Sequence, residues 1–270
     1  MAKEKPTTTF RKDYSAPYYF IESVELLFKL FDEKTRVITK SIFYKNDHGM
    51  PTGAPLILSG EKLNLISVKM DGKPVDPEKY SADNKTLTIN NPPSTFTLEI
   101  ITEIDPARNT SLEGLYRSSG NYCTQCEAEG FRKITYYLDR PDILAKFTVR
   151  IEGDKESCPV MLSNGNCIER GELDANRHYA IWQDPFPKPC YLFALVAGRL
   201  VSLEDEFITR SGKKIDLKIY VEERNRKKCG YAMLSLKKAM KWDEDVFGLE
   251  YDLNTYMIVA VDDFNMGAME

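Results

Sequence analysis

The 270-residue sequence has no surplus of positive charge and no long hydrophobic run. Its 37 Lys and Arg are outnumbered by 41 Asp and Glu, which gives a net charge of -4. This disfavours nucleic-acid binding, because phosphate neutralisation needs clustered positive charge. The longest apolar stretches, 191–198 and 256–261, are far shorter than the roughly 20 residues that span a bilayer. We therefore expect neither nucleic acid nor membrane as a partner.

Histidine and cysteine are also scarce. The two histidines, His48 and His178, stand apart in the sequence and are interpreted as ordinary loop or strand residues. Among the six cysteines only Cys123 and Cys126 have CxxC spacing, whereas a zinc site needs about four ligands. Structural thiols are the simplest interpretation, and a redox pair or half of a metal site are the alternatives.

Familiar hydrolase and export signals are missing too. HExxH, GxSxG and GxxxxGK[ST] do not occur. Residues 1–20 mix charged residues, threonine and proline, without the apolar region of a signal peptide. We expect a cytoplasmic protein whose cysteines stay reduced.

What the sequence does contain is alternation of apolar and polar residues between turns, which is typical of half-buried antiparallel strands. Strands are predicted at 24–30, 37–43, 63–70, 85–89, 96–104 and 147–151, with a hairpin at 207–221 that turns at Ser211-Gly212. Three prolines within 184–189 predict a rigid loop, because proline removes a donor from a strand ladder. Short strands at this spacing favour a mainly β fold, either a β-sandwich or an open curved sheet.

The hydrophobic period changes towards the C-terminal end. A helix is predicted over 229–247, ending at Gly248, because apolar residues recur there at multiples of three to four. These residues are Cys229, Met233, Leu236, Met240 and Phe247. An apolar strand is expected over 255–261. We place a domain boundary near residue 199, which divides the chain into a β-rich region, 1–199, and a mixed region, 200–270.

Two acidic segments differ from ordinary solvated charge runs. In 123–131, Glu127 and Glu129 lie among cysteine, alanine and glycine; in 263–270, Glu270 follows glycine, alanine and methionine. Small residues allow close approach of another backbone, so an extended peptide could pair with the second segment as an added strand. From composition alone, a loop and a chain end are the simpler interpretation.

Longer matches carry a family resemblance. Gly267-Ala268-Met269-Glu270 gives the first four letters of the GAMEN exopeptidase motif. Three further segments match in the same order: QCEAEGF at 125–131, ITYYLDRPD at 134–142 and DPFPKPCYLFALV at 184–196. Together they resemble bacterial aminopeptidase N, the zinc-dependent alanyl aminopeptidases of the gluzincin class, from about Tyr14 to the last residue.

The resemblance implies a saddle-shaped β domain followed by the start of a thermolysin-like α+β catalytic domain. It also implies that Glu127 and Glu270 together bind the α-ammonium group of a peptide substrate and that Gln125 assists them. Met266 would line the pocket for the first side chain. The backbone of Gly267 and Ala268, next to Met269, would hydrogen-bond the peptide.

The resemblance leaves the metal site outside these residues. In the family, the HExxH helix, the distant zinc-binding glutamate and the transition-state tyrosine lie beyond the position of Glu270. We therefore expect zinc in the full-length enzyme, no metal ligand or catalytic residue in this chain, and no activity from the chain alone. The whole protein is expected to be a monomer that releases N-terminal Ala and other residues from peptides. The helix and strand after residue 229 would lack neighbours, which predicts exposed apolar surface and weak order near the C-terminus.

Two alternative interpretations of the function remain. The chain could be a non-catalytic β-rich binding module with no chemistry of its own. It could also belong to a related gluzincin with added epoxide-hydrolase activity, although the matches around Gln125 and in 184–189 favour the bacterial alanyl type.

Overall fold

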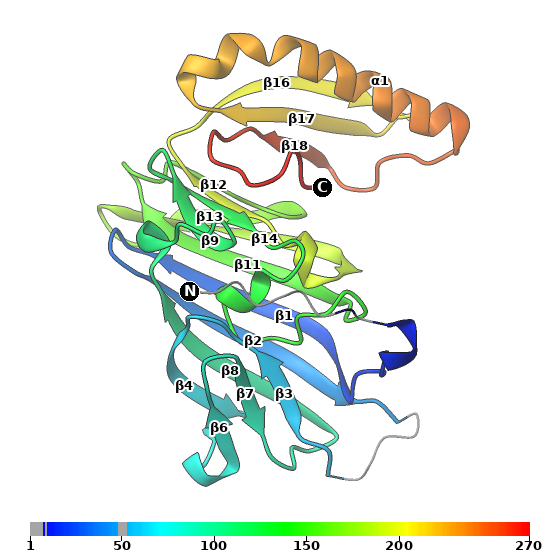
Figure 1. Cartoon of the computed structure of the whole chain (residues 1–270). Coiled ribbons are helices and arrows are strands. Elements are labelled where there is room, and N and C mark those ends of the chain that lie inside the picture. Colours follow the sequence, from blue (N-terminus) through cyan, green and yellow to red (C-terminus); the bar gives the residue numbers. More distant parts are fainter. Residues whose placement is uncertain (1–7, 9, 48–52) are drawn as a thin grey trace.

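The computed structural model describes residues 8, 10–47 and 53–270, so His48 lies outside the described part of the chain. Its largest element is an eight-stranded sheet (Figure 1). In spatial order the strands are β13 (Asn166–Glu172), β14 (Arg177–Lys188), β11 (Ala145–Asp154), β1 (Tyr19–Leu30), β2 (Thr35–Lys45), β8 (Thr95–Ile104), β4 (Asn64–Met70) and β5 (Lys73–Pro74). Apolar and polar residues alternate along β1 because one face of the strand is buried, and Val24, Leu26 and Phe28 lie on that face.

Two smaller sheets pack beside the large one. The first has the order β12 (Val160–Ser163), β15 (Leu195–Gly198), β10 (Asn121–Gln125) and β9 (Gly114–Ser118). The second has the order β3 (Leu56–Ser59), β7 (Thr86–Ile89) and β6 (Tyr80–Ala82). Short 3-10 helices connect the strands: η1 (Arg11–Asp13), η2 (Pro77–Lys79), η3 (Pro106–Arg108), η4 (Phe131–Lys133), η5 (Cys190–Leu192) and η6 (Glu223–Lys228).

A cluster of aromatic rings lies at the centre of the main hydrophobic core. The ring of Phe193 lies 5.8 Å from that of Phe28, 5.3 Å from that of Phe131 and 6.1 Å from that of Phe147, measured between centroids. All four side chains are buried. Because Phe131 opens η4 and Phe193 follows η5, the cluster joins the connecting segments to the strands of the large sheet.

The last elements form a third unit, at the top of Figure 1. Strands β16 (Val201–Ile208), β17 (Lys214–Val221) and β18 (Thr255–Val259) form a sheet in that order. The helix α1 (Gly230–Val246) connects β17 to β18, which run parallel and therefore need such a crossover. A separate apolar cluster lies between the helix and the sheet; it includes Ile215, Leu217, Ile219, Met233, Leu236 and Met240.

The opposite face of this sheet touches the main core, because Tyr220, Met257 and Val259 pack there. The outer side of α1 and the segment after it are exposed: Tyr231 is 80% and Leu249 67% exposed, and Trp242 and Phe247 are also open to solvent. Exposed apolar surface was expected in this region. Gly248 has φ +69°, a backbone conformation that favours glycine, and so ends the helix as predicted.

Most predicted elements are present, and the mainly β fold class is confirmed. The helix and the hairpin at Ser211-Gly212 occur where expected, whereas the last strand ends at Val259 instead of residue 261. Among the described residues, no helix has both the length and the apolar character needed to cross a bilayer.

The predicted loop at 184–189 is wrong, because β14 continues through Pro185 and Pro187 to Lys188. The prolines lie where the ladder is interrupted: β11 pairs Phe147 with Asp184 and Ala145 with Lys188, so the register shifts between these pairs. On its other side, β14 pairs with β13 only as far as Gln183. The prolines therefore occupy a bulge where their missing N–H groups cost no ladder hydrogen bond.

The aromatic cluster allows a stability prediction. Phe193→Ala should lower the free energy of unfolding by about 3–5 kcal/mol, because it removes a buried ring from three aromatic partners. Urea titration followed by circular dichroism would measure this change. Phe186→Ala is the matched control, since Phe186 is 44% exposed. Equal losses in the two variants would contradict the central role of Phe193.

Candidate functional site

The hairpin of β9 and β10 carries the first part of the candidate site. Gln125 is the last residue of β10 and pairs with Gly114 of β9. Its side chain is completely buried. The amide Nε2 donates to Sδ of Met266 at 2.7 Å and to the backbone oxygen of Glu127 at 3.3 Å. The amide Oε1 is buried and has no hydrogen-bond partner among the residues that the structure describes. One end of this amide is therefore an unused hydrogen-bond acceptor.

A tight turn follows Gln125 and presents Glu127. The N–H of Gly130 donates to the carbonyl oxygen of Cys126 at 2.8 Å and closes the turn. Cys126 and Gly130 are buried, Glu127 is half-buried and Glu129 is exposed. The peptide bond between Glu127 and Ala128 is cis. The turn thus holds Glu127 at its tip while both ends are fixed in the core.

A buried carboxylate holds the chain just beyond this turn. Asp139 accepts hydrogen bonds from the backbone N–H of Arg132 at 3.1 Å and from its Nε at 2.8 Å. The thiol of Cys190 donates to the other oxygen of Asp139 at 3.1 Å. Arg132 also forms an ion pair with Glu129 at 3.2 Å. Together these contacts limit the movement of the segment that follows Glu127.

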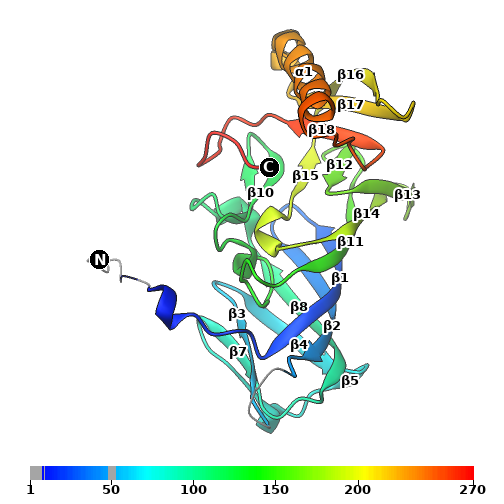
Figure 2. The same ribbon diagram turned by 90° about the vertical axis from the view of Figure 1, so that its right-hand side faces the viewer.

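The C-terminal segment crosses to the same hairpin, and Figure 2 shows its end beside β10. The hydroxyl of Tyr116 donates to the carbonyl oxygen of Asp263 at 2.8 Å, and the hydroxyl of Ser118 donates to its carboxylate at 2.9 Å. Gln125 and Met266, which are 141 positions apart, are in contact. The structure therefore brings together the two segments that the sequence singles out.

The predicted site residues differ in their surroundings. Gln125 and Met266 touch each other, whereas Gly267, Ala268 and Glu270 are exposed and Met269 is half-buried. In the part of the chain that the structure describes, neither the Glu127 nor the Glu270 carboxylate forms an ion pair or accepts a hydrogen bond. Both are therefore free to accept a cation. Convergence of the two carboxylates on one amine stays a prediction.

Burial controls the titration of the groups around Gln125. It raises the pKa of Cys123 to about 12 and that of Cys126 well above its ordinary value. Burial also raises the pKa of Tyr116. These thiols stay protonated near neutral pH, and a protonated thiol is a poor nucleophile and metal ligand. This favours structural thiols over a redox pair or half of a metal site.

The implied zinc does not fit the residues present. Across residues 8, 10–47 and 53–270, no group of three or more His, Cys, Asp or Glu side chains is placed to hold a metal ion. The arrangement can bind and orient a cationic group. No chemical step through a metal can be assigned to these residues.

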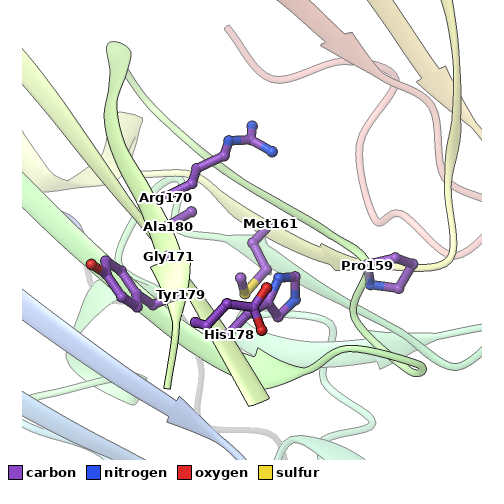
Figure 3. A pocket seen from close by; sticks show the side chains of 8 residues that line it. Pro159, Met161, Arg170, Gly171, His178, Tyr179 and Ala180 are labelled. Atoms are coloured by element: carbon purple, nitrogen blue, oxygen red, sulfur yellow. The ribbon is translucent and has the colours of Figure 1, made fainter. Parts of the chain in front are cut away.

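A separate pocket lies between β12, β13 and β14 (Figure 3). It is lined in part by Met161, Arg170, His178 and Tyr179, and contains none of the predicted site residues. The Nε2 of His178 lies 2.8 Å from the carbonyl oxygen of Cys158. This half-buried strand histidine has a structural contact, in agreement with its interpretation as an ordinary strand residue.

The comparisons with known proteins identify the family. Residues 52–192 match the model of the peptidase M1 N-terminal domain, and residues 231–270 match that of the peptidase family M1 domain. The chain belongs to the peptidase M1 family. Aminopeptidase N of Escherichia coli (strain K12) is 55% identical over 267 residues, which are 99% of this chain and 30% of that protein. Aminopeptidase N of Haemophilus influenzae is 50% identical over 97% of this chain and 30% of its own length.

Solved structures of M1 relatives agree with the fold. The crystal structure of Legionella pneumophila aminopeptidase A in complex with aspartic acid matches with TM-score 0.90 and 35% identity, over 95% of this chain and 30% of that one. An M1 zinc metallopeptidase of Deinococcus radiodurans, bound to a Tyr-Ser-Ala substrate, matches with TM-score 0.74 and 14% identity, over 89% and 56% of the two chains. This second likeness concerns the fold alone. The chain spans about 30% of the length of the two aminopeptidase N proteins and of the Legionella aminopeptidase A.

Sequence reasoning missed the residues that attach the C-terminal segment to the hairpin: Tyr116, Ser118 and Asp263. The one available signal was the two-residue spacing of the hydroxyl-bearing side chains of Tyr116 and Ser118, which places them on one face of a strand. Their partner is 145 or more positions away, so no local pattern connects them.

The turn that presents Glu127 depends on Gly130. A Cβ at this position would lie 2.4 Å from the carbonyl oxygen of Gln125 and 3.0 Å from the Cα of Cys126. Both are backbone atoms, so Gly130→Ala should displace the turn and lower the free energy of unfolding by about 1–3 kcal/mol. Urea titration and the amide NMR shifts of 125–129 would measure both effects.

Gly230→Ala is the control for this variant. A Cβ on Gly230, at the first position of α1, would meet nothing within 4 Å. This substitution should be neutral or stabilising, because alanine favours the helix. If Gly130→Ala left the resonances of 125–129 in place, the close packing of this turn would not be what positions Glu127.

Proposed function

We propose that this chain supplies the part of an M1 aminopeptidase that recognises the free N-terminus of a peptide. The contact between Gln125 and Met266 carries the proposal, because it places the Glu127 turn beside the segment that ends in Glu270. The whole protein would then release N-terminal residues, Ala and others, from peptides. The high identity to bacterial aminopeptidase N proteins supports the assignment to this type of enzyme.

The chemistry follows from what distinguishes the start of a peptide. An exopeptidase must recognise a cationic amine, since no internal peptide N–H carries a charge. Each charge-assisted hydrogen bond to the ammonium contributes about 1.5–3 kcal/mol. An internal peptide bond would leave carboxylates such as Glu127 and Glu270 without a counter-charge, which is costly away from water. The same contacts set the register of the substrate.

Three features of this chain support that role. The Glu127 carboxylate is half-buried at the tip of its turn, and within the described residues it pairs with no cation. Among the described residues the buried Oε1 of Gln125 has no hydrogen-bond donor, so an acceptor next to the Glu127 turn is unused. The exposed backbone of Gly267 and Ala268 can pair with an extended peptide as an added strand. Met266, which Gln125 contacts, would line the pocket for the first side chain.

Other parts of the proposal concern the whole protein. Zinc would be held by residues outside this chain, and there it would activate water and polarise the scissile carbonyl. We also propose a domain boundary near residue 199, supported by the separate apolar cluster of β16, β17 and α1. We also propose a cytoplasmic location, which the sequence led us to expect, and a monomeric state of the full-length enzyme.

The activity itself can be tested directly. The protein expressed from the complete reading frame that encodes this chain should hydrolyse an alanine chromogenic amide, and a chelator should abolish the turnover. Absence of turnover would favour the alternative of a non-catalytic β-rich binding module. Turnover that survives the chelator would exclude a metallopeptidase.

The role of Glu127 makes a narrower prediction. In the same complete protein, Glu127→Gln should lower kcat/KM for substrates with a free amine by about 10- to 100-fold, because a charged acceptor is replaced by a neutral one. The kcat/KM for N-blocked substrates should change little. Competition between free and blocked alanyl amides would measure the selectivity.

Glu129→Gln is the matched control in the same turn. Its side chain is exposed and, within the described part of the chain, forms an ion pair with Arg132 alone, so its loss should change selectivity less than about threefold. If Glu127→Gln kept the wild-type preference for free amines, the proposed role of this carboxylate would be wrong.

A further inference from the structure

Asp263 attaches the C-terminal segment to β9 by three hydrogen bonds. Ser118 Oγ donates to Oδ2 of Asp263 at 2.9 Å, and the N–H of Asp263 donates back to the same Oγ at 3.1 Å. The hydroxyl of Tyr116 donates to the carbonyl oxygen of Asp263 at 2.8 Å. The single hydroxyl of Ser118 thus acts as donor and acceptor at once.

The two partners of Asp263 are rigid. Tyr116 is 0% and Ser118 2% exposed, and they lie two residues apart on one strand, so their side chains point to the same side. Burial raises the pKa of Tyr116, so its hydroxyl keeps its proton near neutral pH and remains a donor. Asp263, in contrast, is exposed. An exposed segment is therefore held by two buried side chains of one strand.

The same hairpin holds Asp263 and the recognition residues. Gln125 ends β10, the partner strand of β9, and touches Met266, which is three residues after Asp263. Between them, Nδ2 of Asn265 donates to the carbonyl oxygen of Leu112, just before β9, at 3.1 Å. Successive residues of the segment are thus attached along one hairpin. The position of 267–270 relative to Glu127 depends on these attachments.

We propose that Asp263 is a positioning residue that uses Ser118 and Tyr116 to place 267–270 opposite Glu127. This inference rests on the proposed function, because it concerns how the two glutamates come to share one amine. Asp263 itself does not touch the substrate. Without its carboxylate, the hydrogen bond from Ser118 Oγ to Oδ2 is lost, while the two backbone hydrogen bonds of residue 263, the Asn265 hydrogen bond and the Met266 thioether contact remain.

The neighbouring residue Asp262 provides a control of equal charge. It is exposed and forms an ion pair with Arg224 of η6, not with the hairpin. Removal of Asp262 therefore deletes a carboxylate from the same stretch without releasing it from β9. Any effect of Asp263 that Asp262 does not share comes from attachment to β9 and not from local charge.

The first experiment measures positioning in the 270-residue chain. With the nine methionines labelled as [13C]methyl, Met266 is assigned through Met266→Leu. Asp263→Ala and Ser118→Ala should shift and narrow the Met266 methyl resonance towards its random-coil position. Asp262→Ala should leave it unchanged. In Asp263→Asn the amide oxygen still accepts from Ser118, so this conservative variant should keep the wild-type resonance.

The second experiment measures function in the protein from the complete reading frame. Asp263→Ala should raise KM for a free alanyl amide and reduce the preference for free over blocked substrates by about 10- to 100-fold, since a 1 Å misplacement can cost about 100-fold. Asp263→Asn should restore most of this preference. The double variant of Ser118→Ala and Asp263→Ala should be no worse than Ser118→Ala alone, because Ser118→Ala already removes both hydrogen bonds between these residues.

The outcomes separate the two proposals. A wild-type protein without a preference for free amines would overturn the proposed function, while the Met266 resonance would still decide whether Asp263 positions the segment. An unshifted Met266 resonance in Asp263→Ala would overturn the inference. A lower melting temperature of Asp263→Ala together with an unchanged preference for free amines would also overturn it, because a residue with a merely structural role would give that result.

Discussion

The hairpin of β9 and β10 holds both halves of the candidate site. Gln125 at the end of β10 fixes the start of the Glu127 turn and touches Met266, while Tyr116 and Ser118 on β9 hold Asp263. The hairpin is itself fixed, because β10 pairs with β15 on its other side. Two segments that are far apart in the chain thus meet on a single rigid support, and a site formed from such segments needs one.

Much of the fold follows from local patterns. Alternation along β1 and β2 predicts their hairpin, since one face of each strand is buried, and the period of Met233, Leu236 and Met240 predicts α1 for the same reason. These elements could be read from the sequence because burial repeats with a fixed period. The position of Gly248 marks the end of the helix in the same local way.

Long-range features could not be predicted in this manner. The prolines of β14 are tolerated because the register of β11 shifts beside them, and a register shift depends on the partner strand. The contacts of Asp263 and Met266 with the hairpin likewise join residues more than a hundred positions apart. The candidate residues Gln125, Glu127 and 266–270 were found by resemblance to a motif, and the hydroxyl groups that hold them have no such motif.

The parallel pairing of β1 with β11 also concerns synthesis of the chain. Ser23 of β1 lies opposite Lys146 of β11, whereas β2 follows β1 directly. During translation, one edge of β1 can pair at once, but its other edge waits until β11 has left the ribosome. The chain between β1 and β11, residues 31–144, must close into a loop before these strands can pair. Closing so long a loop costs entropy and makes the pairing slow. Until then, the unpaired edge of β1 presents backbone N–H and C=O groups that can pair with a strand of another chain.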